Sequence, residues 1–260
     1  MKGGSDLAPK RRETESRINI MGCWIDNLSM QETLLAIERL VNSKRPNQHV
    51  VVNVDKIVKA HRDPQLMDVI NGCDLVNVDG MPVVWASKLL GRPLKERVTG
   101  VDLFYRLIDL AEKRNWRVYF LGAKEEIVKK VVTRLLAKHP ALNIAGHHHG
   151  YWELDQELSI VDQIKKSQAD LLFVAISSPK KEQFLGRYQK QMGVSFSMGV
   201  GGTFDIVAGI AKRAPRWMQK VGLEWFYRFL QEPRRMFKRY FVDDMYFFWL
   251  LAKEVMKERT

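Results

Sequence analysis

Short apolar runs rich in β-branched residues alternate with longer segments of helical period along most of this chain. Runs of about four to six residues are typical of buried parallel strands, and the segments between them suit helices that cross from one strand to the next. The alternation predicts a doubly wound α/β fold with a mostly parallel sheet. The expected strands are Ile18–Met21, His49–Val54, Leu75–Val78, Arg117–Leu121, Leu142–Ala145, Leu171–Ile176 and Val194–Met198.

The expected helices fill the gaps between these runs. One begins at Ser29, where Ser29 and Glu32 have the spacing of a capping box ahead of an apolar stripe. In a sheet of this kind ligands bind at the carboxyl ends of the strands, so residues that directly follow a run are the first candidates for chemistry. The other expected helices cover residues 81–90, 102–114, 124–138, 156–167 and 179–191.

The sequence pattern divides the chain into three parts. Residues 1–16 are polar and expected to be mobile, and residues 17–210 carry the alternating pattern of an α/β core. Residues 211–260, called the appendage below, lose the strand pattern and are expected to be helical, with a break near Pro233. Hydrophobic residues make up 46% of the chain and charged residues 28%, which excludes disorder of the whole chain.

The appendage is both basic and aromatic. Nine Lys or Arg residues stand against two acids between Lys212 and Arg239, and 12 of the chain's 26 aromatic residues lie between Trp217 and Trp249. The formal net charge of +12 favours an anionic partner, such as nucleic acid, an acidic membrane surface or a phosphorylated substrate. Basic and aromatic residues together are typical of helices that lie on anionic membranes. The alternative is a last layer of core helices whose basic faces are merely solvated.

Other classes of protein are disfavoured by what the sequence lacks. Its two cysteines, Cys23 and Cys73, are too few for a disulfide framework and have no zinc-site spacing, which fits a reducing cytosol. No run of 18 apolar residues exists, so we expect no membrane span. The three adjacent histidines, His147–His149, lack a carboxylate or cysteine at ligand spacing, and we expect no bound metal and no cofactor.

Polar residues follow two of the expected strands. Asn53 and Asp55 come after the run that begins at His49, where they either cap the next helix or face a ligand. Asp79 ends the buried run Leu75–Val78, ahead of Gly80 and an apolar helix. From position alone it serves equally well as a cap for that helix or as a carboxylate facing a crevice, where partial desolvation raises the pKa and makes a usable general base.

Glycines follow two other strands. The Gly-rich turn, Gly199–Asp205, follows an expected strand and opens a helix, so its backbone amides have the placement that binds phosphate oxygens. Gly122 repeats the pattern after an earlier strand. Neither matches the dinucleotide fingerprint or the P-loop. The two turns indicate a diphosphate or nucleotide site, or else tight connections with no ligand.

Lysines and arginines form the remaining candidates. Lys180 and Lys181 follow the very apolar run Leu171–Ile176, where they either pair with a phosphate or are solvated surface lysines. The arginines of the appendage can form charge-assisted forks to phosphate and so replace a metal ion at a diphosphate leaving group. Nucleic acid also attracts arginine interleaved with aromatic residues.

Seven stretches of the chain resemble the WecG/TagA/CpsF family of bacterial glycosyltransferases, and the resemblance runs from about Ile18 to Tyr240. It implies an α/β core and a C-terminal appendage that completes the active site and docks on the membrane. It also implies transfer of a sugar from a UDP-sugar to a sugar already linked by diphosphate to a polyprenol, with inversion and without metal. The stretches are DGMPVVWASKLLG, ERVTGVDLFYRL, FLGAKEE, SSPKKEQF, MGVGGTFDIVAG, KRAPRWMQKVGLEWFYRFLQEPRR and FKRY.

The resemblance also implies roles for particular residues. Asp79 matches the family's general base, and Arg228 and Arg235 match arginines that act on the departing UDP. Lys181 stands where the family has Gln, which implies altered sugar recognition, and Asn53 with Asp55 departs from the family's Thr-x-Asn. The next basic position is Lys238 with Arg239 beside it. The full set of implied substrate-binding residues is Asn53, Asp55, Arg97, Gly122, Lys181, Gly201, Gly202, Asp205, Arg213, Lys238 and Arg239.

We therefore expect a UDP-sugar-dependent glycosyltransferase of bacterial surface polysaccharide synthesis. Its partners would be a UDP-sugar, a polyprenyl-diphosphate-linked saccharide, the anionic inner face of the cell membrane and a second copy of the chain, but not nucleic acid. The alternative is a non-enzymatic nucleotide-binding α/β module whose basic tail binds nucleic acid. Nothing before residue 211 has the pattern of a nucleic-acid motif.

Overall fold

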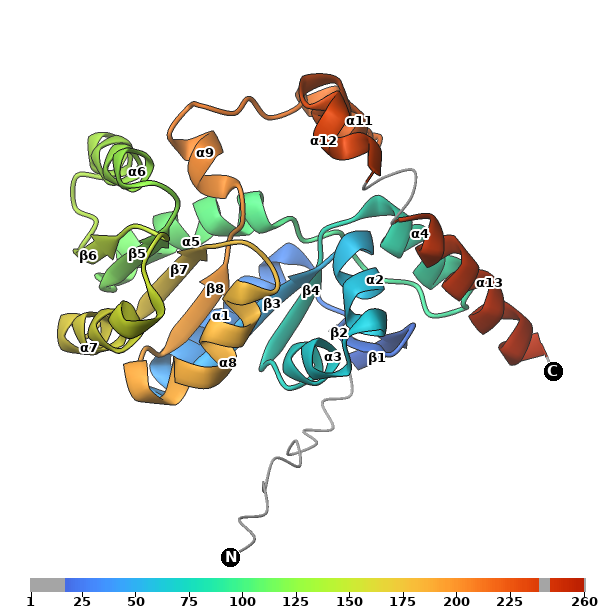
Figure 1. Cartoon of the computed structure of the whole chain (residues 1–260), viewed down its shortest axis with the longest axis horizontal. Helices are drawn as coiled ribbons and strands as arrows, with labels where there is room; N and C mark the ends of the chain where they lie inside the picture. Colours follow the sequence, from blue (N-terminus) through green and yellow to red (C-terminus); the bar gives the residue numbers. More distant parts are fainter. Residues whose placement is uncertain (1–16, 239–243, 260) are drawn as a thin grey trace, which may run out of the picture.

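The computed structural model describes residues 17–238 and 244–259, and over these residues the chain is a three-layer α/β protein (Figure 1). The central sheet has six parallel strands in the order β4-β3-β8-β7-β5-β6. A small antiparallel hairpin, β1 (Arg17–Ile20) and β2 (Cys23–Asp26), stands beside it. The six strands are β3 (Asn47–Val52), β4 (Leu75–Val78), β5 (Val118–Gly122), β6 (Ile144–His148), β7 (Leu171–Ala175) and β8 (Phe196–Gly199).

The strand order brings the two ends of the α/β core together in the middle of the sheet. β3, from the first part of the chain, pairs with β8, the last strand, through Asn47–His49 and Phe196–Met198. Every strand of this sheet runs in the same direction, so the segments that leave β4, β3, β8 and β7 emerge side by side at one edge. This edge is where open α/β sheets bind ligands.

Side chains alternate between the two faces of the sheet. In β7, Leu171 and Phe173 pack into the core on one face, while Leu172 and Val174 pack into the core on the other. Helices α1 (Met30–Asn42), α5 (Gly100–Arg114), α6 (Glu125–Lys138) and α9 (Thr203–Val207) cover the first face. Helices α2 (Val54–Arg62), α3 (Pro64–Asn71), α7 (Glu157–Ser167) and α8 (Lys180–Met192) cover the second. Leu154–Gln156 forms a single 3₁₀ turn.

The helices of the appendage follow the last strand. They are α10 (Arg216–Lys220), α11 (Glu224–Gln231), α12 (Pro233–Lys238) and α13 (Met245–Arg259). α13 lies against α2 and inserts Phe247, which is fully buried, into the core on that face. In Figure 1, α11 and α12 lie at the top of the view, above α4 (Met81–Leu89), the helix that follows β4. Within the described residues no helix is both long and apolar enough to cross a membrane.

The sequence-based fold prediction is confirmed, with local corrections. All seven expected strands form, and the expected capping box at Ser29 makes both of its hydrogen bonds. The run expected as His49–Val54 ends as a strand at Val52, because Asn53 already caps α2. The prediction from sequence missed β2 and α3, and it anticipated α2 only through the capping alternative for Asn53, without bounds. The division of the chain at residue 211 stays a prediction. Phe247 of the appendage packs in the same hydrophobic core as the residues of β4.

Candidate active site

Asp79 lies at the carboxyl end of β4, beside the end of β3. Its backbone N–H donates to Val52 O at 2.9 Å, which continues the sheet pairing by one residue. The N-cap of α4 is Gly80, and no side chain caps this helix, so Asp79 does not have the capping role that its position allowed. Its carboxylate instead accepts a 3.4 Å hydrogen bond from the N–H of Gly100, the first residue of α5. The side chain is therefore directed between two helix starts.

The surroundings of Asp79 raise its pKa to about 6, mainly because burial disfavours the charged carboxylate. The negative charge of Glu224 adds to this shift. The guanidinium groups of Arg97 and Arg228, together with the Gly100 N–H, act in the opposite direction. A carboxylate with this pKa is deprotonated at neutral pH yet basic enough to accept a proton in a transition state.

Two of the charges that act on Asp79 come from α11, so the appendage reaches the end of β4. The turn before α11 packs directly on α4. A Cβ added to Gly222 would lie 2.6 Å from Met81 Cγ, and Gly222 has a φ of +79°, so only glycine fits this close approach. The appendage therefore covers the start of the helix that follows Asp79.

Ion pairs and hydrogen bonds between charged side chains hold the appendage against the core. We call Arg97, Asp102, Arg213 and Glu224 the clasp. Arg213 Nη2 donates to Asp102 Oδ2 at 2.8 Å, and its Nε donates to Glu224 Oε1 at 3.2 Å. Arg97 Nη1 lies 3.7 Å from Glu224 Oε2, and its Nη2 donates to Gln219 O at 3.2 Å. Arg213 holds the pKa of Asp102 below its usual range, which is the signature of a favourable pair.

The predicted substrate-binding residues Arg97 and Arg213 are thus engaged by protein carboxylates, and they join the core to α10 and α11. Arg228, on the solvent side of α11, is exposed. Arg235 and Lys238 lie in α12, and the positions of their side chains are not described. Arg239 lies outside the described residues. The choice between Lys238 and Arg239 therefore stays open.

The polar pair after β3 has local partners. The Asn53 side chain accepts from Lys56 N at 3.0 Å as the N-cap of α2. Asp55 Oδ2 lies 3.0 Å from Lys59 Nζ, one turn further along the same helix. The capping alternative is the one that the structure bears out for Asn53. Contact with an acceptor sugar stays a prediction for both residues.

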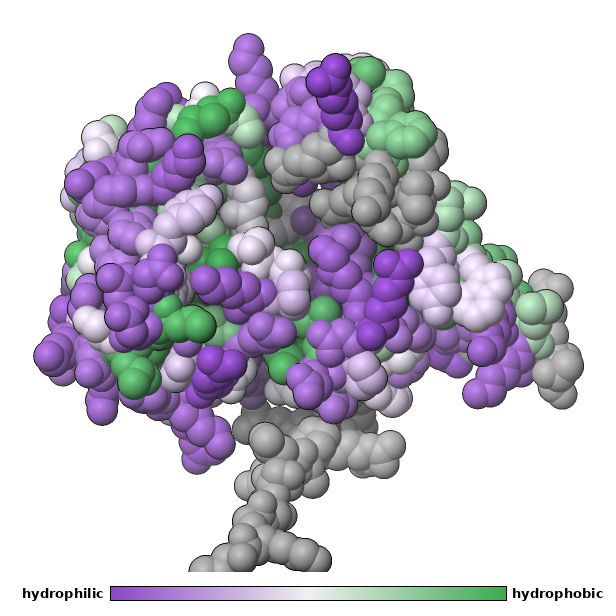
Figure 2. Space-filling view, viewed as in Figure 1, coloured by the Kyte–Doolittle hydropathy of each residue, from purple (hydrophilic) through white to green (hydrophobic). Residues whose placement is uncertain are grey.

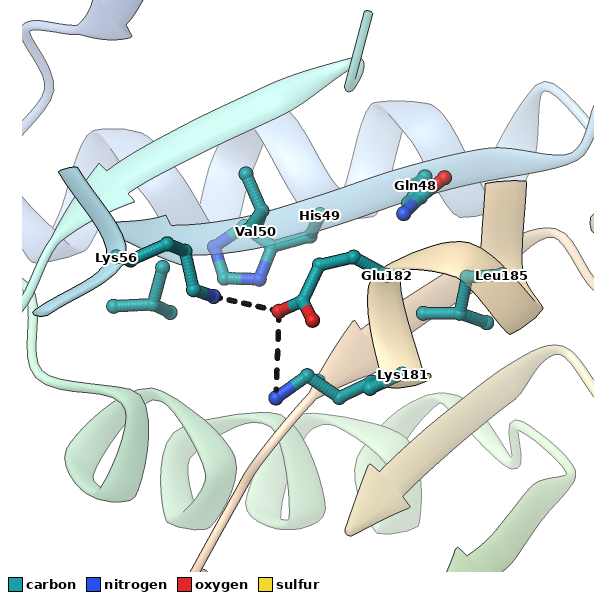
Figure 3. A pocket seen from close by; sticks show the side chains of 9 residues that line it. Gln48, His49, Val50, Lys56, Lys181, Glu182 and Leu185 are labelled. Atoms are coloured by element: carbon teal, nitrogen blue, oxygen red, sulfur yellow. Dashed lines mark ion pairs between the residues drawn. The ribbon is translucent and has the colours of Figure 1, made fainter. Parts of the chain in front are cut away.

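A buried charge cluster lies between the ends of β3 and β7. Lys56, at the start of α2, and Lys181, at the start of α8, both point toward Glu182 (Figure 3). The Nζ–Oε1 distances are 2.8 Å from Lys56 and 3.6 Å from Lys181. The expectation that the lysines after β7 are solvated holds for Lys180 and is wrong for Lys181, which is 7% exposed. Burial and the charge of Lys56 lower the pKa of Lys181 to about 8.

The Gly-rich turn lies at the end of the neighbouring strand, β8. Gly201 and Gly202 are exposed, and the space beside the Gly201 Cα is open. Phe204 anchors the following helix, α9, in the aromatic core, where its ring centroid lies 5.9 Å from that of Phe120. Asp205 is half-buried beside Gly202. The turn therefore presents backbone rather than bulky side chains at this edge of the sheet.

Packing alone explains the glycine at position 122. A Cβ there would lie 2.5 Å from the Ala175 backbone of β7, and the φ is +126°. Its predicted contact with substrate remains a prediction. The histidines His147–His149 end and follow β6, and the described residues contain no group of three His, Cys, Asp or Glu side chains that could hold a metal ion.

Two functional candidates were missed by reasoning from the sequence. In the sequence, Glu224 was noted only as one of two acids in a basic segment. Its position among arginines was the one feature that could have predicted an ion pair. Lys56 has a weaker signal, because Ala60, which lies one turn further along the same face of α2, is buried. Their partners, Arg97 and Glu182, are distant in sequence, so no local pattern reveals the pairs.

The site combines a carboxylate with a raised pKa at the carboxyl edge of a parallel sheet with a basic appendage that packs against the following helix. These features are those of an enzyme that acts on an anionic substrate, and the comparison with known families gives the class. The family described as "Glycosyl transferase WecG/TagA/CpsF family" matches residues 18–260, and the chain belongs to this family.

Three named relatives carry the same description of activity, N-acetylglucosaminyldiphosphoundecaprenol N-acetyl-beta-D-mannosaminyltransferase. The protein of Bacillus subtilis (strain 168) is 35% identical over 207 residues, which cover 80% of each chain. That of Bacillus spizizenii is 36% identical over 186 residues, covering 72% of each chain. That of Staphylococcus aureus (strain MW2) is 31% identical over 232 residues, covering 88% of this chain and 91% of the relative.

Proposed function

We propose that this glycosyltransferase moves a sugar from a UDP-sugar to a saccharide linked by diphosphate to a polyprenol, with inversion and without a metal ion. The observation that carries the proposal is Asp79, a carboxylate at the edge where such sheets bind ligands, whose pKa is raised to about 6 although the charges of Arg97 and Arg228 act to lower it. The names of the three relatives support an acceptor of the N-acetylglucosaminyl-diphosphate-polyprenol type.

In the proposed mechanism Asp79 accepts the proton of the acceptor hydroxyl group. The hydroxyl oxygen attacks the anomeric carbon of the donor from the face opposite the UDP. The bond between that carbon and the UDP oxygen breaks, and UDP leaves with the electron pair. A single displacement of this kind inverts the anomeric centre and needs one base rather than a pair of carboxylates.

The departing diphosphate requires positive charge, and the proposal assigns this to the appendage. Arg228 lies close enough to Asp79 for its charge to lower the pKa of that carboxyl group. Arg235 follows on α12. Fixed guanidinium groups stabilise developing negative charge in a site that excludes water, as a metal ion does elsewhere. The Gly-rich turn, in which Gly201 and Gly202 are exposed, is the proposed contact for the donor's phosphates.

The appendage also supports a peripheral position on the membrane. Its helices expose large apolar side chains near basic ones, which is the composition of a surface that docks on anionic lipid. Figure 2 shows hydrophobic residues over the C-terminal helices at the upper right of the molecule. The exposed apolar residues of α10 to α12 and the turns between them are Trp217, Val221, Trp225, Phe226, Leu230 and Phe237.

The experiment is a transfer assay on the full chain, with a soluble N-acetylglucosaminyl-diphosphate-lipid analogue as the acceptor. A panel of UDP-sugars is tested with and without EDTA, and the anomeric configuration of the product is read by NMR. We expect transfer with inversion and full activity in EDTA. Retention of configuration, or an absolute need for added Mg²⁺ or Mn²⁺, would refute the corresponding part of the proposal.

A further inference from the structure

Helix α4 is apolar on its outer face as well as on its inner face. The inner face packs into the core through Val83 and Val84, which are buried. The exposed side chains of α4 are Trp85, Lys88 and Leu89, and the tryptophan and the leucine are 51% and 60% exposed. A surface helix ordinarily turns charged and polar residues to water, whereas a helix that is apolar all round is normally covered. The outer face of α4 therefore has the composition of a contact surface.

Three apolar side chains, Met81, Trp85 and Leu89, form one row along this face, which we call the α4 stripe. Side chains four residues apart lie one above the other on a helix, so the stripe follows the axis from the first residue of α4 to the last. At 1.5 Å per residue, Trp85 lies about 6 Å and Leu89 about 12 Å from Met81 along the axis. Lys88 is the one charged residue of this helix.

The α4 stripe begins at the proposed active site. Gly80, the N-cap of α4, is the one residue between Asp79 and Met81. The turn before α11 touches the stripe at this end, since a Cβ added to Gly222 would lie 2.6 Å from Met81 Cγ and 3.8 Å from Trp85 Cζ2. An apolar surface therefore runs from the neighbourhood of the proposed base to the far end of α4.

We propose that the α4 stripe binds the polyprenyl chain of the acceptor. The inference rests on the proposed function, since it places the lipid part of the same acceptor. The acceptor hydroxyl group lies at Asp79 in that mechanism, and the saccharide and its diphosphate separate the hydroxyl group from the lipid. The offset of Trp85 and Leu89 from the start of α4 leaves room for these polar groups. Isoprene units carry no polar atoms, so burial against apolar side chains is what stabilises them in the complex.

A bilayer and a second copy of the chain are the other candidates for an exposed apolar face. The α4 stripe is one side chain wide, because the remaining positions of the helix are buried or half-buried or carry Lys88. It also begins two residues after Asp79. A narrow row that starts at the base suits a single bound lipid chain better than an extended surface does.

The test is calorimetric titration of the full chain, saturated with UDP, without vesicles or detergent. Two acceptors share N-acetylglucosaminyl diphosphate and differ only in the lipid, which has one isoprene unit in the first and three in the second. We expect the longer acceptor to bind about tenfold or more tightly, because its additional isoprene units are buried on the stripe. Trp85→Ser and Leu89→Ser should each reduce this preference, and Trp85→Ser should reduce it to about threefold or less.

Two control variants leave the stripe intact. Lys88→Gln changes the charged residue on the same face of α4, and Leu158→Ser removes a leucine of similar exposure, 55%, from α7. Both should keep the wild-type preference for the longer acceptor. The affinity for UDP, measured on every variant, shows whether its site has kept its fold.

Three outcomes would overturn the inference. In the first, the wild-type chain binds the two acceptors equally, and a dimer in sedimentation velocity that Trp85→Ser dissociates would then assign the stripe to a second copy. In the second, Trp85→Ser weakens binding of both acceptors equally, which makes the tryptophan a support for the site rather than a contact for the lipid. In the third, the chain binds UDP but neither acceptor, and then the proposed function fails as well.

Discussion

Asp79 is under two opposing electrostatic influences, and their balance sets its chemistry. Burial and Glu224 raise its pKa, while Arg97 and Arg228 lower it, with a result of about 6. Without the arginines the carboxyl group would remain protonated closer to neutral pH and be unable to accept a proton. Without burial it would be a much weaker base. The appendage contributes both Glu224 and Arg228, so its position adjusts the base as well as covering it.

The first prediction at this scale is a pH profile. A general base acts in its deprotonated form, and the pKa of Asp79 is raised, so turnover should be lost as the pH falls through about 6 and be constant above it. Glu224→Gln should move this limb to lower pH, because Glu224 raises the pKa. The measurement is kcat between pH 5 and 8. Glu38→Gln, in an exposed pair with Arg114, is the control and should not move the limb. A rate independent of pH across this interval would contradict the role of Asp79.

The position of α10 and α11 at the site depends on how closely the appendage approaches α4. Gly222 packs on Met81, and the clasp ties Glu224 to Arg97 and Arg213. These contacts hold α10 and α11 over the end of β4. We expect any change that separates α11 from α4 to reduce turnover more than it reduces the stability of the core.

Gly222→Ala tests this expectation against a matched glycine. Gly222 and Gly91 both have positive φ, +79° and +66°, so alanine strains each backbone by about 1–2 kcal/mol. Only at position 222 would the added Cβ also collide with Met81, since nothing lies within 4 Å at position 91. Gly222→Ala should lower kcat by about tenfold or more, while Gly91→Ala should lower only the melting temperature. Equal loss of activity in the two variants would show that the approach of Gly222 to Met81 is irrelevant to turnover.

The strands and helices also show which parts of the fold could be predicted from the sequence. Most strands of the main sheet are apolar runs because both faces of the sheet are covered, so they were predictable. The exception is the edge strand β6 (Ile144–His148), which is only half-buried, ends in two histidines and overlaps its predicted run, Leu142–Ala145, only at Ile144 and Ala145. β2 was missed because its turn, Met21–Gly22, places a methionine at a φ of +46°, and methionine is not a turn signal. The start of α3 had a usable signal in Asp63 and Pro64, a cap followed by proline at the first position.

The residues of the site were only partly predictable, because some are located by the fold and others only by tertiary packing. Asp79 and the Gly-rich turn follow strands, so the fold rule alone locates them. The clasp and the pairing of Lys56 with Glu182 join side chains from opposite parts of the chain. Their geometry depends on tertiary packing, and Lys181 looks like an ordinary surface lysine until β8 is placed beside it.

At the scale of the whole molecule, the charge of +12 and the apolar surface of the appendage predict salt-dependent docking on anionic membranes. Trp217 and Leu230 are 63% and 59% exposed, so their replacement by serine should not disturb the core. The double variant should lose most binding to anionic liposomes while turning over a soluble acceptor at the wild-type rate.

The control for this prediction is Leu158→Ser, which removes an equally exposed leucine (55%) from α7, on a different part of the molecule. Co-sedimentation at two salt concentrations gives the binding. If the double variant and the control bind liposomes equally well, the apolar residues of α10 and α11 are not the docking surface.

The most direct test of the mechanism is Asp79→Asn, with turnover and UDP affinity measured on the same preparation at pH 7. We predict that kcat falls by about 10²–10⁴-fold, the usual contribution of a general base, while the dissociation constant for UDP stays within about twofold. Because the folded protein raises the pKa of Asp79, the charged carboxylate is a liability to stability above pH 6, and the variant should melt no lower than the wild type. Turnover within a few-fold of the wild type, in a variant that folds and binds UDP normally, would contradict the assignment of Asp79 as the base.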